Sequence, residues 1–580
     1  MTKAKSALCA GSLALMLALS ACSGGGSGTP SSAPASSGAS DTSFTNTNAQ
    51  PRSALQQGGE LNMPIGEFTE QKNQFHQDGT TDTWTFWDWY NAEMIKFKPN
   101  GDLNINPAYL LSVTPQDVDG KTVVTYVMNP QAKFNDGTPM DIKAFQNTWK
   151  ANNGSDPAYL PSSTDGWNKI ASVEQGKDAF EIVVTFIGPW PWWGGVFNTL
   201  LHPACNTADC FNTGYLGNDM ASAHPEWGVG PYKLQSFDGL AGNAVFVPNE
   251  NWWGDKGLLD KVTIVQRDAQ AEMNALNNGE IDSMEPFSAA DTLNQVKNAP
   301  GTETRTGAAT SNFMLQINSQ SAKSPALQDI KVRQAIMMSV DRQKVQSVRF
   351  GAMGYTEPFP GSFLLFGFQT GYVDNFSKVV PNVDIAGAKA LLEGDGYVMG
   401  ADGFYAKDGA QLSTGITVFG DATSTIALAQ SVQAMLKDAG INVTIDQRAS
   451  ADFSDVMSRG DWDMNISGFA SGDPFGVAYT CQIYCSQADP NYSGLNKSGT
   501  GNADLDAKIH AMEQLPTAEE QIDAANALEV DAFATYGLMP LFNGPSMTQT
   551  KVNLANVGSA VFAGKAGAMG DFRENIGWMA

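Results

Sequence analysis

The sequence predicts a large α/β protein, and three observations carry that prediction. Runs rich in β-branched and aromatic residues, which are typical of strands, occur at 121–128 (KTVVTYVM) and at 180–187 (FEIVVTFI). A helix is predicted at 423–438, where apolar residues recur near helical spacing and Gly440 follows as a stop signal. A strand-like run at 442–446 comes directly afterwards, so that helix, glycine and strand form one α/β unit.

Composition limits the class of protein. The chain has 580 residues, of which 42% are hydrophobic and 16% charged, enough apolar material to build several cores. Lys and Arg number 35 against 60 Asp and Glu, which gives a net charge of −25. Phosphate groups must be neutralised by Lys and Arg, so this balance argues against nucleic acid as a partner. The sequence has no fixed-period repeat, which argues against a solenoid or a propeller.

The first residues resemble an export signal. Lys3 and Lys5 precede a short apolar stretch at 7–19, which is too short to span a bilayer as a helix. The stretch ends in Leu-Ser-Ala-Cys, which resembles the lipobox of bacterial lipoproteins. We therefore expect residues 1–21 to be a lipoprotein signal peptide and Cys22 to be lipidated. A plain secreted protein is the alternative. No stretch elsewhere in the sequence reaches 18 apolar residues without a charge.

A polar segment follows the predicted lipid site. Ser, Gly, Ala, Thr, Pro and Asn dominate it, and such a composition cannot bury enough apolar surface to offset the entropy of ordering. Residues 22–56 are therefore predicted to be a flexible tether. The expected location is the cell membrane, with the folded body held on its extracytoplasmic side through the N-terminal lipid.

Four cysteines remain in the body of the chain, as the close pairs Cys205/Cys210 and Cys481/Cys485. An even number of cysteines in an oxidising compartment predicts two disulfides. Local pairing, Cys205–Cys210 and Cys481–Cys485, is the simplest connectivity, and cross-pairing stays open. A metal site is the alternative, although neither spacing is the usual C-x₂-C and the four histidines are scattered.

Two common catalytic motifs are absent from the sequence. It contains neither G-x-S-x-G nor H-E-x-x-H. A partial phosphate-loop match at 120–122 has Pro115 where glycine is required, and a partial calcium loop at 489–500 ends in Thr500 rather than glutamate. We therefore expect neither an enzyme nor a resident cofactor.

Five segments occur in a characteristic order along the chain. They are KFNDGTPMDIKAF at 133–145, GVGPYKL and NENWWG between 228 and 254, LNNGEID at 276–282, DIKVRQAI and VDR between 329 and 342, and AKALL and GY between 388 and 397. Together they resemble the family 5 extracellular solute-binding proteins of ABC importers, the oligopeptide- and dipeptide-binding group. The resemblance covers roughly residues 57 to 550.

This resemblance implies an architecture and a role. The fold would be periplasmic-binding-protein-like, of type II with an extra domain, and its two lobes would close on a ligand cleft. The protein would be a monomer that captures an oligopeptide and delivers it to ABC permease subunits. The implied domains are domain I at 57–67, 203–307 and 541–580, domain II at 68–202, and domain III at 308–540.

The resemblance also suggests ligand residues. In the family an Asp that pairs with the peptide amine follows a G-W-x-x-D type segment, and this chain has GFASGDP at 468–474. Phe469 replaces the usual Trp and the spacing differs by one residue, so Asp473 is either the amine partner or part of an Asp-Pro turn. Phe469 is a candidate pocket wall or a core residue, and Tyr159 occupies a position where some members place a ligand-facing Tyr.

Tryptophan clusters keep a second ligand class open. Trp87 and Trp89 lie in the stretch 83–100, where the chain departs from the family pattern, and further tryptophans crowd 190–193. Sugars stack on Trp faces, although core packing is the more frequent use of an aromatic ring. An oligosaccharide or another small solute is therefore the alternative ligand. A different class, an exported sensor or hydrolase built on the same fold, is the third hypothesis.

Overall fold

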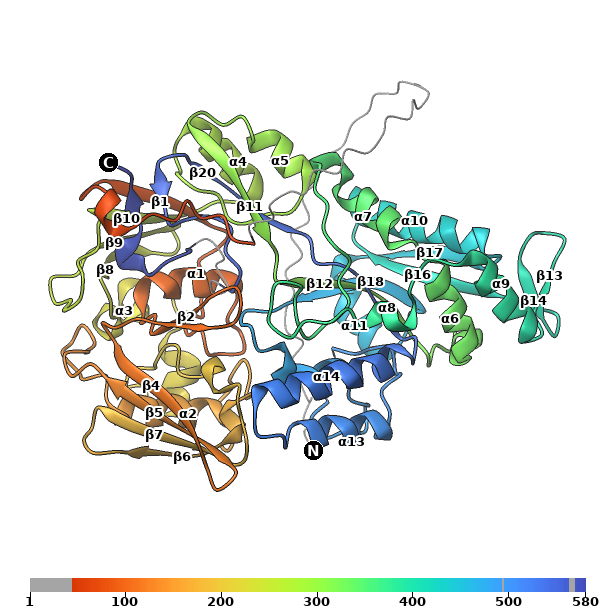
Figure 1. Ribbon diagram of the computed structural model, residues 1–580. Helices are drawn as coiled ribbons and strands as arrows, with labels where there is room; N and C mark the ends of the chain where they lie inside the picture. The colour runs from red at the N-terminus through yellow and green to blue at the C-terminus, as the bar shows by residue number, and fades with distance from the viewer. Residues whose placement is uncertain (1–43, 493–494, 563–568) are drawn as a thin grey trace, which may run out of the picture.

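The computed structural model describes residues 44–492, 495–562 and 569–580, which form two lobes (Figure 1). The predicted signal peptide, the lipidation site Cys22 and most of the predicted tether lie outside the described residues. The first lobe, on the left in Figure 1, contains the N-terminal half of the chain and the C-terminus. The second lobe contains the strands and helices between β12 and β19.

The first lobe is built on a four-stranded sheet made by distant parts of the chain. Its order is β1 (Glu60–Ile65), β10 (Lys261–Gln266), β9 (Asn243–Pro248) and β8 (Tyr232–Asp238). β1 runs parallel to β10, and the other pairs are antiparallel. Helix α1 (Thr81–Tyr90) packs on this sheet, and Phe86, Trp87 and Trp89 contribute to its core.

A second antiparallel sheet completes this lobe. Its order is β4 (Leu110–Val118), β5 (Lys121–Met128), β7 (Glu181–Phe186) and β6 (Ile170–Gln175), with α2 (Ile142–Asn152) against β6 and β7. Alternate residues of β5 and β7 are buried, which is the pattern of strands with one covered face. The strands predicted at 121–128 and 180–187 are thus confirmed to within a residue or two.

The second lobe has a five-stranded mixed sheet. Its order is β17 (Asn442–Arg448), β16 (Ser413–Phe419), β18 (Met464–Ala470), β12 (Ser311–Ile317) and β19 (Leu538–Phe542). The predicted helix and strand around Gly440 are α10 (Thr423–Asp438) and β17, and β17 pairs in parallel with β16. Gly440 has φ +80°, the left-handed conformation that ends helices. The α/β class is confirmed.

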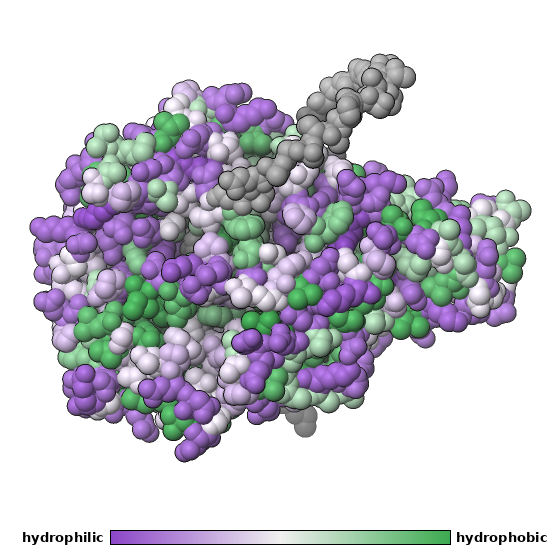
Figure 2. All heavy atoms as spheres, in the orientation of Figure 1, coloured by the Kyte–Doolittle hydropathy of each residue, from purple (hydrophilic) through white to green (hydrophobic). Residues whose placement is uncertain are grey.

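Other elements surround these sheets. In the first lobe they are β2 (Ile95–Phe97), β3 (Leu103–Ile105), α3 (Met220–Ala223), α4 (Ala269–Asn278), α5 (Ala290–Val296), β11 (Thr302–Ala308), β20 (Pro545–Lys551), β21 (Leu554–Ala555) and β22 (Gly577–Trp578). In the second they are α6 (Ile330–Ser339), α7 (Arg342–Phe350), α8 (Phe376–Val379), α9 (Ile385–Gly394), β13 (Val398–Met399), β14 (Tyr405–Lys407), β15 (Ala410–Gln411), α11 (Phe453–Arg459), α12 (Thr480–Tyr484), α13 (Ala503–Met512) and α14 (Ala518–Phe533). Apolar side chains lie at the right-hand end of Figure 2, over the β13–β14 hairpin, where Val398 is 69% exposed.

The chain passes between the lobes twice, at neighbouring places. One crossing joins β11 to β12 and the other joins β19 to β20, and β11 pairs antiparallel with β20. The Ala309 amide donates to the carbonyl of Gly544 at 3.0 Å, and Asn543 Nδ2 donates to the carbonyl of Ser311 at 2.7 Å. The Glu357 carboxylate accepts from the amide of Asn543 at 2.7 Å, which fixes the second crossing to the second lobe. We refer to these two crossings, which connect the lobes covalently, as the hinge.

The packing agrees with the implied domains in one respect and differs from them in another. The strands at 60–65 and 232–266 share one sheet, in agreement with a discontinuous first domain. Helix α1 lies inside the range assigned to domain II, 68–202, yet packs on that same sheet. The three-domain division therefore stays a prediction.

Three buried or half-buried carboxyl groups lie together in the first lobe: Asp88 on α1, Glu272 on α4 and Glu285 after it. The Glu285 amide donates to Glu272 Oε1 at 2.9 Å. Burial and, to a lesser extent, the charge of Glu93 raise the pKa of Asp88 to about 7. Burial also raises the pKa of Glu272 to about 7. The pKa of Glu285 is raised by burial and by Glu272.

We expect Asp88→Asn to remove part of the dependence of stability on pH. Because the folded-state pKa of Asp88 is raised, its contribution to stability is fully present below about pH 4 and is lost as the pH rises through about 7. The Tm of the Asn variant minus the Tm of the wild type should therefore be larger at pH 8 than at pH 5. Asp523→Asn, at an exposed position of α14, is the control. An equal Tm difference at both pH values would contradict this assignment.

Candidate functional site between the two lobes

The segment that follows β18 carries both ligand residues suggested near residue 470. Phe469 lies on β18 opposite Asn312 of β12 and is half-buried, and its ring contacts Phe363 with centroids 6.2 Å apart. Phe469 therefore lies near the end of β18 that adjoins the first crossing, where the amide of Ser471 donates to the carbonyl of Thr310 at 2.7 Å. Asp473 lies three residues beyond the strand.

The Asp473 carboxylate organises the loop in which it lies. Oδ1 accepts from the amide of Phe475 at 2.8 Å, a turn typical of Asp, and Oδ2 accepts from the hydroxyl of Tyr479 at 2.7 Å. Burial raises the pKa of Tyr479 well above its ordinary value, and the Asp473 charge raises it further, so the phenol stays a proton donor.

The same loop makes an apolar contact between the lobes. The ring of Phe475 lies edge-on to Phe97 of the first lobe, with centroids 5.3 Å apart, and 6.1 Å from the ring of Trp192. Gly194 is required here, because a Cβ at this position would lie 2.9 Å from Phe475 Cζ. Phe475 and Trp192 are 9% and 7% exposed, so the lobes share a buried core at this contact.

Polar contacts surround this core. The Trp192 indole donates to Gln521 Oε1 at 2.7 Å, and Lys169 Nζ lies 3.4 Å from Glu513 Oε2. Gln482 Nε2 donates to Asp165 Oδ2 at 2.5 Å. In each pair one residue belongs to the first lobe and the other to the second. Figure 1 shows the corresponding elements side by side, with α13 and α14 beside the sheet of β4 to β7.

The other suggested ligand residues lie in the core of the first lobe. Trp87 is 2% exposed and Trp89 is 0% exposed. Trp87 Nε1 donates to Thr199 Oγ1 at 3.4 Å, and Trp89 packs on Tyr232. Tyr159 is 5% exposed and its hydroxyl donates to the carbonyl of Asn206 at 3.0 Å. This geometry supports core packing rather than ligand stacking for all three.

Sequence reasoning missed Phe475, Tyr479 and Gln521 as residues of this contact. One signal was present in the sequence, since two glycines follow directly after the tryptophans at 190–193, and adjacent glycines indicate close approach of another surface. The partner surface lies more than 270 residues away, so the pairing itself could not be read from that signal.

Both cysteine pairs form local disulfides, Cys205–Cys210 and Cys481–Cys485. Asp489 Oδ1 lies 3.7 Å from the sulfur of Cys481, and His510 Nε2 lies 2.6 Å from Asp489 Oδ2. A zinc site would need cysteine thiolates, and these two sulfurs are bonded to each other. The geometry therefore supports the disulfide rather than the metal alternative.

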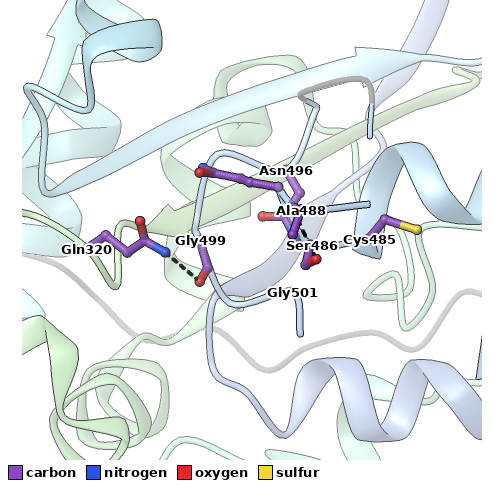
Figure 3. Close-up of a pocket in the computed structure, with 8 residues that line it drawn as sticks. Gln320, Cys485, Ser486, Ala488, Asn496, Gly499 and Gly501 are labelled. Atoms are coloured by element: carbon purple, nitrogen blue, oxygen red, sulfur yellow. Dashed lines mark hydrogen bonds between the residues drawn. The ribbon is translucent and has the colours of Figure 1, made fainter. Parts of the chain in front are cut away.

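A pocket of about 220 Å³ lies within the second lobe (Figure 3). Gln320 forms one side, and its Nε2 donates to the carbonyl of Gly499 at 3.4 Å. The remaining lining residues are Cys485, Ser486, Gln487, Ala488, Asn496, Gly499 and Gly501. These residues carry no charge and come from one lobe, so closure of the lobes would not enclose a ligand there. We keep the contact between the lobes as the candidate site.

Within the described ranges, none of the helices has the length and apolar character needed to cross a bilayer.

The chain is similar to a family of known proteins and to solved structures. The family model of the bacterial extracellular solute-binding proteins, family 5, matches residues 104–491. The oligopeptide-binding protein OppA of Mycobacterium tuberculosis is 29% identical over 539 residues, which cover 89% of this chain and 85% of OppA.

Two solved structures share the fold. The periplasmic EDTA-binding protein EppA has a TM-score of 0.79 at 20% identity, covering 94% of this chain and all of EppA. The oligopeptide-binding protein AppA from Bacillus subtilis, solved with a nonapeptide, has a TM-score of 0.67 at 19% identity, covering 91% of this chain and all of AppA.

Proposed function

Because the chain belongs to family 5 of the bacterial extracellular solute-binding proteins, which serve ABC importers, we propose that it captures oligopeptides between its two lobes and delivers them to an ABC permease. The relation to OppA carries this proposal, because it extends over most of both chains and OppA is named for oligopeptide binding. We also propose that the protein acts as a monomer on the extracytoplasmic side of the cell membrane, held there by lipid on Cys22.

Asp473 and Phe469 are the proposed ligand residues. Asp473 is held in place by its bonds to Phe475 and Tyr479, so its carboxylate is oriented before a ligand arrives. A peptide ammonium would add charge-assisted hydrogen bonds to the same carboxylate. Phe469 would provide an apolar wall at the end of β18.

A different small solute is the alternative ligand. EppA, which has the same fold, is named for binding EDTA, so the fold accommodates ligands other than peptides. An oligosaccharide has less support, because Trp87 and Trp89 pack in the core. Proteins of this family bind solutes and are not enzymes, which removes the hydrolase hypothesis.

Native mass spectrometry of the full chain, purified from rich medium without denaturation, tests the proposal. A series of bound masses that fragment into amino acids would support peptide capture. A single bound mass that yields sugar fragments or a chelate would replace the peptide with that solute.

We expect Asp473→Asn to weaken binding of peptides with a free amino terminus. A hydrogen bond to a charged group contributes roughly 1.5–3 kcal/mol, so the loss should be about 10- to 100-fold in Kd. Asn retains an acceptor for the Phe475 amide, and its Nδ2 can donate to the Tyr479 hydroxyl oxygen in place of the present bond, so the loop should keep its shape. Isothermal titration with trialanine and N-acetyl-trialanine measures the effect. The acetylated peptide is the control, since it lacks the ammonium group and should bind both proteins equally. An equal loss for both peptides would show that Asp473 shapes the loop without contacting the amine.

A further inference from the structure

The bond between Trp192 and Gln521 is the most buried of the polar contacts between the lobes. Gln521 is 1% exposed and lies in the first turn of α14, and Trp192 is 7% exposed and follows β7 of the first lobe. Their atoms are 2.7 Å apart across the boundary between the lobes.

The amide of Gln521 is oriented by its own lobe. Its Nε2 donates to the carbonyl of Leu515 at 2.8 Å and to that of Glu513 at 3.5 Å, so Oε1 faces the first lobe. Gln521 thus presents a fixed acceptor, and the indole N–H of Trp192 satisfies it only when the lobes are in contact.

The position of this bond makes it sensitive to rotation about the hinge. In Figure 1 the crossings around β11 and β12 lie above α14, and α14 is at the lower side of the contact. A rotation about the hinge that opens the cleft would therefore separate Trp192 from Gln521. Lys169 and Glu513 would separate in the same movement.

From this geometry we propose that Trp192 and Gln521 form a latch that holds the two lobes closed, whatever ligand lies between them. The proposal rests on the proposed function, capture between lobes that open and close. In the open state water satisfies both groups, whereas in the closed state the loss of one partner leaves the other buried and unpaired. Such a loss acts on the closed state alone and therefore shortens the lifetime of every bound ligand by the same factor.

Trp192→Phe in the full chain removes the N–H donor and keeps an aromatic ring at the contact. An unpaired buried acceptor disfavours the closed state on the order of tenfold, so the dissociation rates of trialanine and penta-alanine should both rise about tenfold. Trp192→Phe combined with Gln521→Leu removes both partners of the bond between the lobes and should recover most of the loss in dissociation rate. The carbonyls of Leu515 and Glu513 lose their Gln521 donor within the second lobe, which lowers the Tm without separating the open and closed states. Trp253→Phe is the matched control, because the Trp253 indole donates to the carbonyl of Ala108 at 2.7 Å within the first lobe.

Three outcomes would overturn the latch. Unchanged dissociation rates with a lower Tm would indicate a contact that never opens. A rate increase that differs between the two peptides would make Trp192 a ligand contact. An equal effect of Trp253→Phe would show that general destabilisation is responsible.

The proposed function can fail while the latch holds. If neither peptide binds the wild type, X-ray scattering of the same proteins tests the latch without a ligand. Trp192→Phe should then have a larger radius of gyration than the wild type and Trp253→Phe, and equal radii would reject the latch.

Discussion

Arg305→Leu is expected to lower the free energy of unfolding by about 3–5 kcal/mol, the range for removing one partner of a buried charged interaction. Arg305 lies on β11 and is 1% exposed. Its Nη1 donates to the carbonyls of Val557 at 2.6 Å and Thr47 at 3.4 Å, and its Nε donates to Glu303 Oε1 at 2.9 Å. Further bonds run from Nη2 to two carbonyls at the end of β20.

These bonds join four separate pieces of the first lobe beside the hinge. Leucine would leave their buried carbonyls without a donor, and an unpaired buried group costs about 1–3 kcal/mol. Urea unfolding followed by circular dichroism measures the change. Arg459→Leu is the control, because Arg459 is 60% exposed and pairs with Asp455 on the surface of α11, a contact worth about 0.3–0.5 kcal/mol. A loss for Arg305→Leu as small as that of the control would contradict the assigned role.

Glu529→Ala is expected to cost a similar amount, about 3–5 kcal/mol, in the second lobe. Glu529 lies on α14 and is fully buried. Oε1 accepts from the amide of Phe363 at 2.9 Å and from the hydroxyl of Tyr484 at 2.7 Å, and Oε2 accepts from Asn375 Nδ2 at 3.0 Å. Alanine removes all three acceptor contacts and leaves a cavity.

Glu529→Gln separates hydrogen bonding from charge. Burial raises the pKa of Glu529, so a neutral side chain of the same shape suits the site. Glutamine retains an acceptor for the Phe363 amide and the Tyr484 hydroxyl, and it loses the acceptor that Asn375 uses. We therefore expect Gln to cost less than half as much as Ala in urea unfolding. Equal losses for the two variants would indicate that the ionised carboxylate itself stabilises the lobe.

Family membership could be predicted from the sequence because its signals are local. The Asn-Asp-Gly turn at 135–137 and the Asp341 cap of α7 each depend on a few consecutive residues. Five such segments in order indicated the family, and the match over residues 104–491 confirms it. The strands at 121–128 and 180–187 were predictable for the same reason, since alternation along a strand is a local pattern.

The candidate site was predicted only in part. The short segment around Phe469 and Asp473 was identified from its resemblance to the family. The loop of Asp473 reaches the first lobe through Phe475, and the ligand roles of Phe469 and Asp473 stay predictions. Trp87 and Trp89 were suggested because tryptophans were crowded, but crowding does not reveal whether a ring faces a cleft or a core. Both rings lie in the core of the first lobe: Trp89 packs on Tyr232 of β8, and Trp87, on the other side of α1, packs against Phe75 and Tyr215.

The sequence by itself determined the α/β class, the family and the order of the elements, because each follows from patterns within a few dozen residues. Only the tertiary structure decided which surfaces meet. Trp192 and Gln521 are 329 residues apart, and Lys169 and Glu513 are 344 residues apart. Their pairing depends on how the two hinge crossings orient one lobe against the other. A single sequence does not show which of its distant surfaces pair with one another, so the latch emerges only in three dimensions.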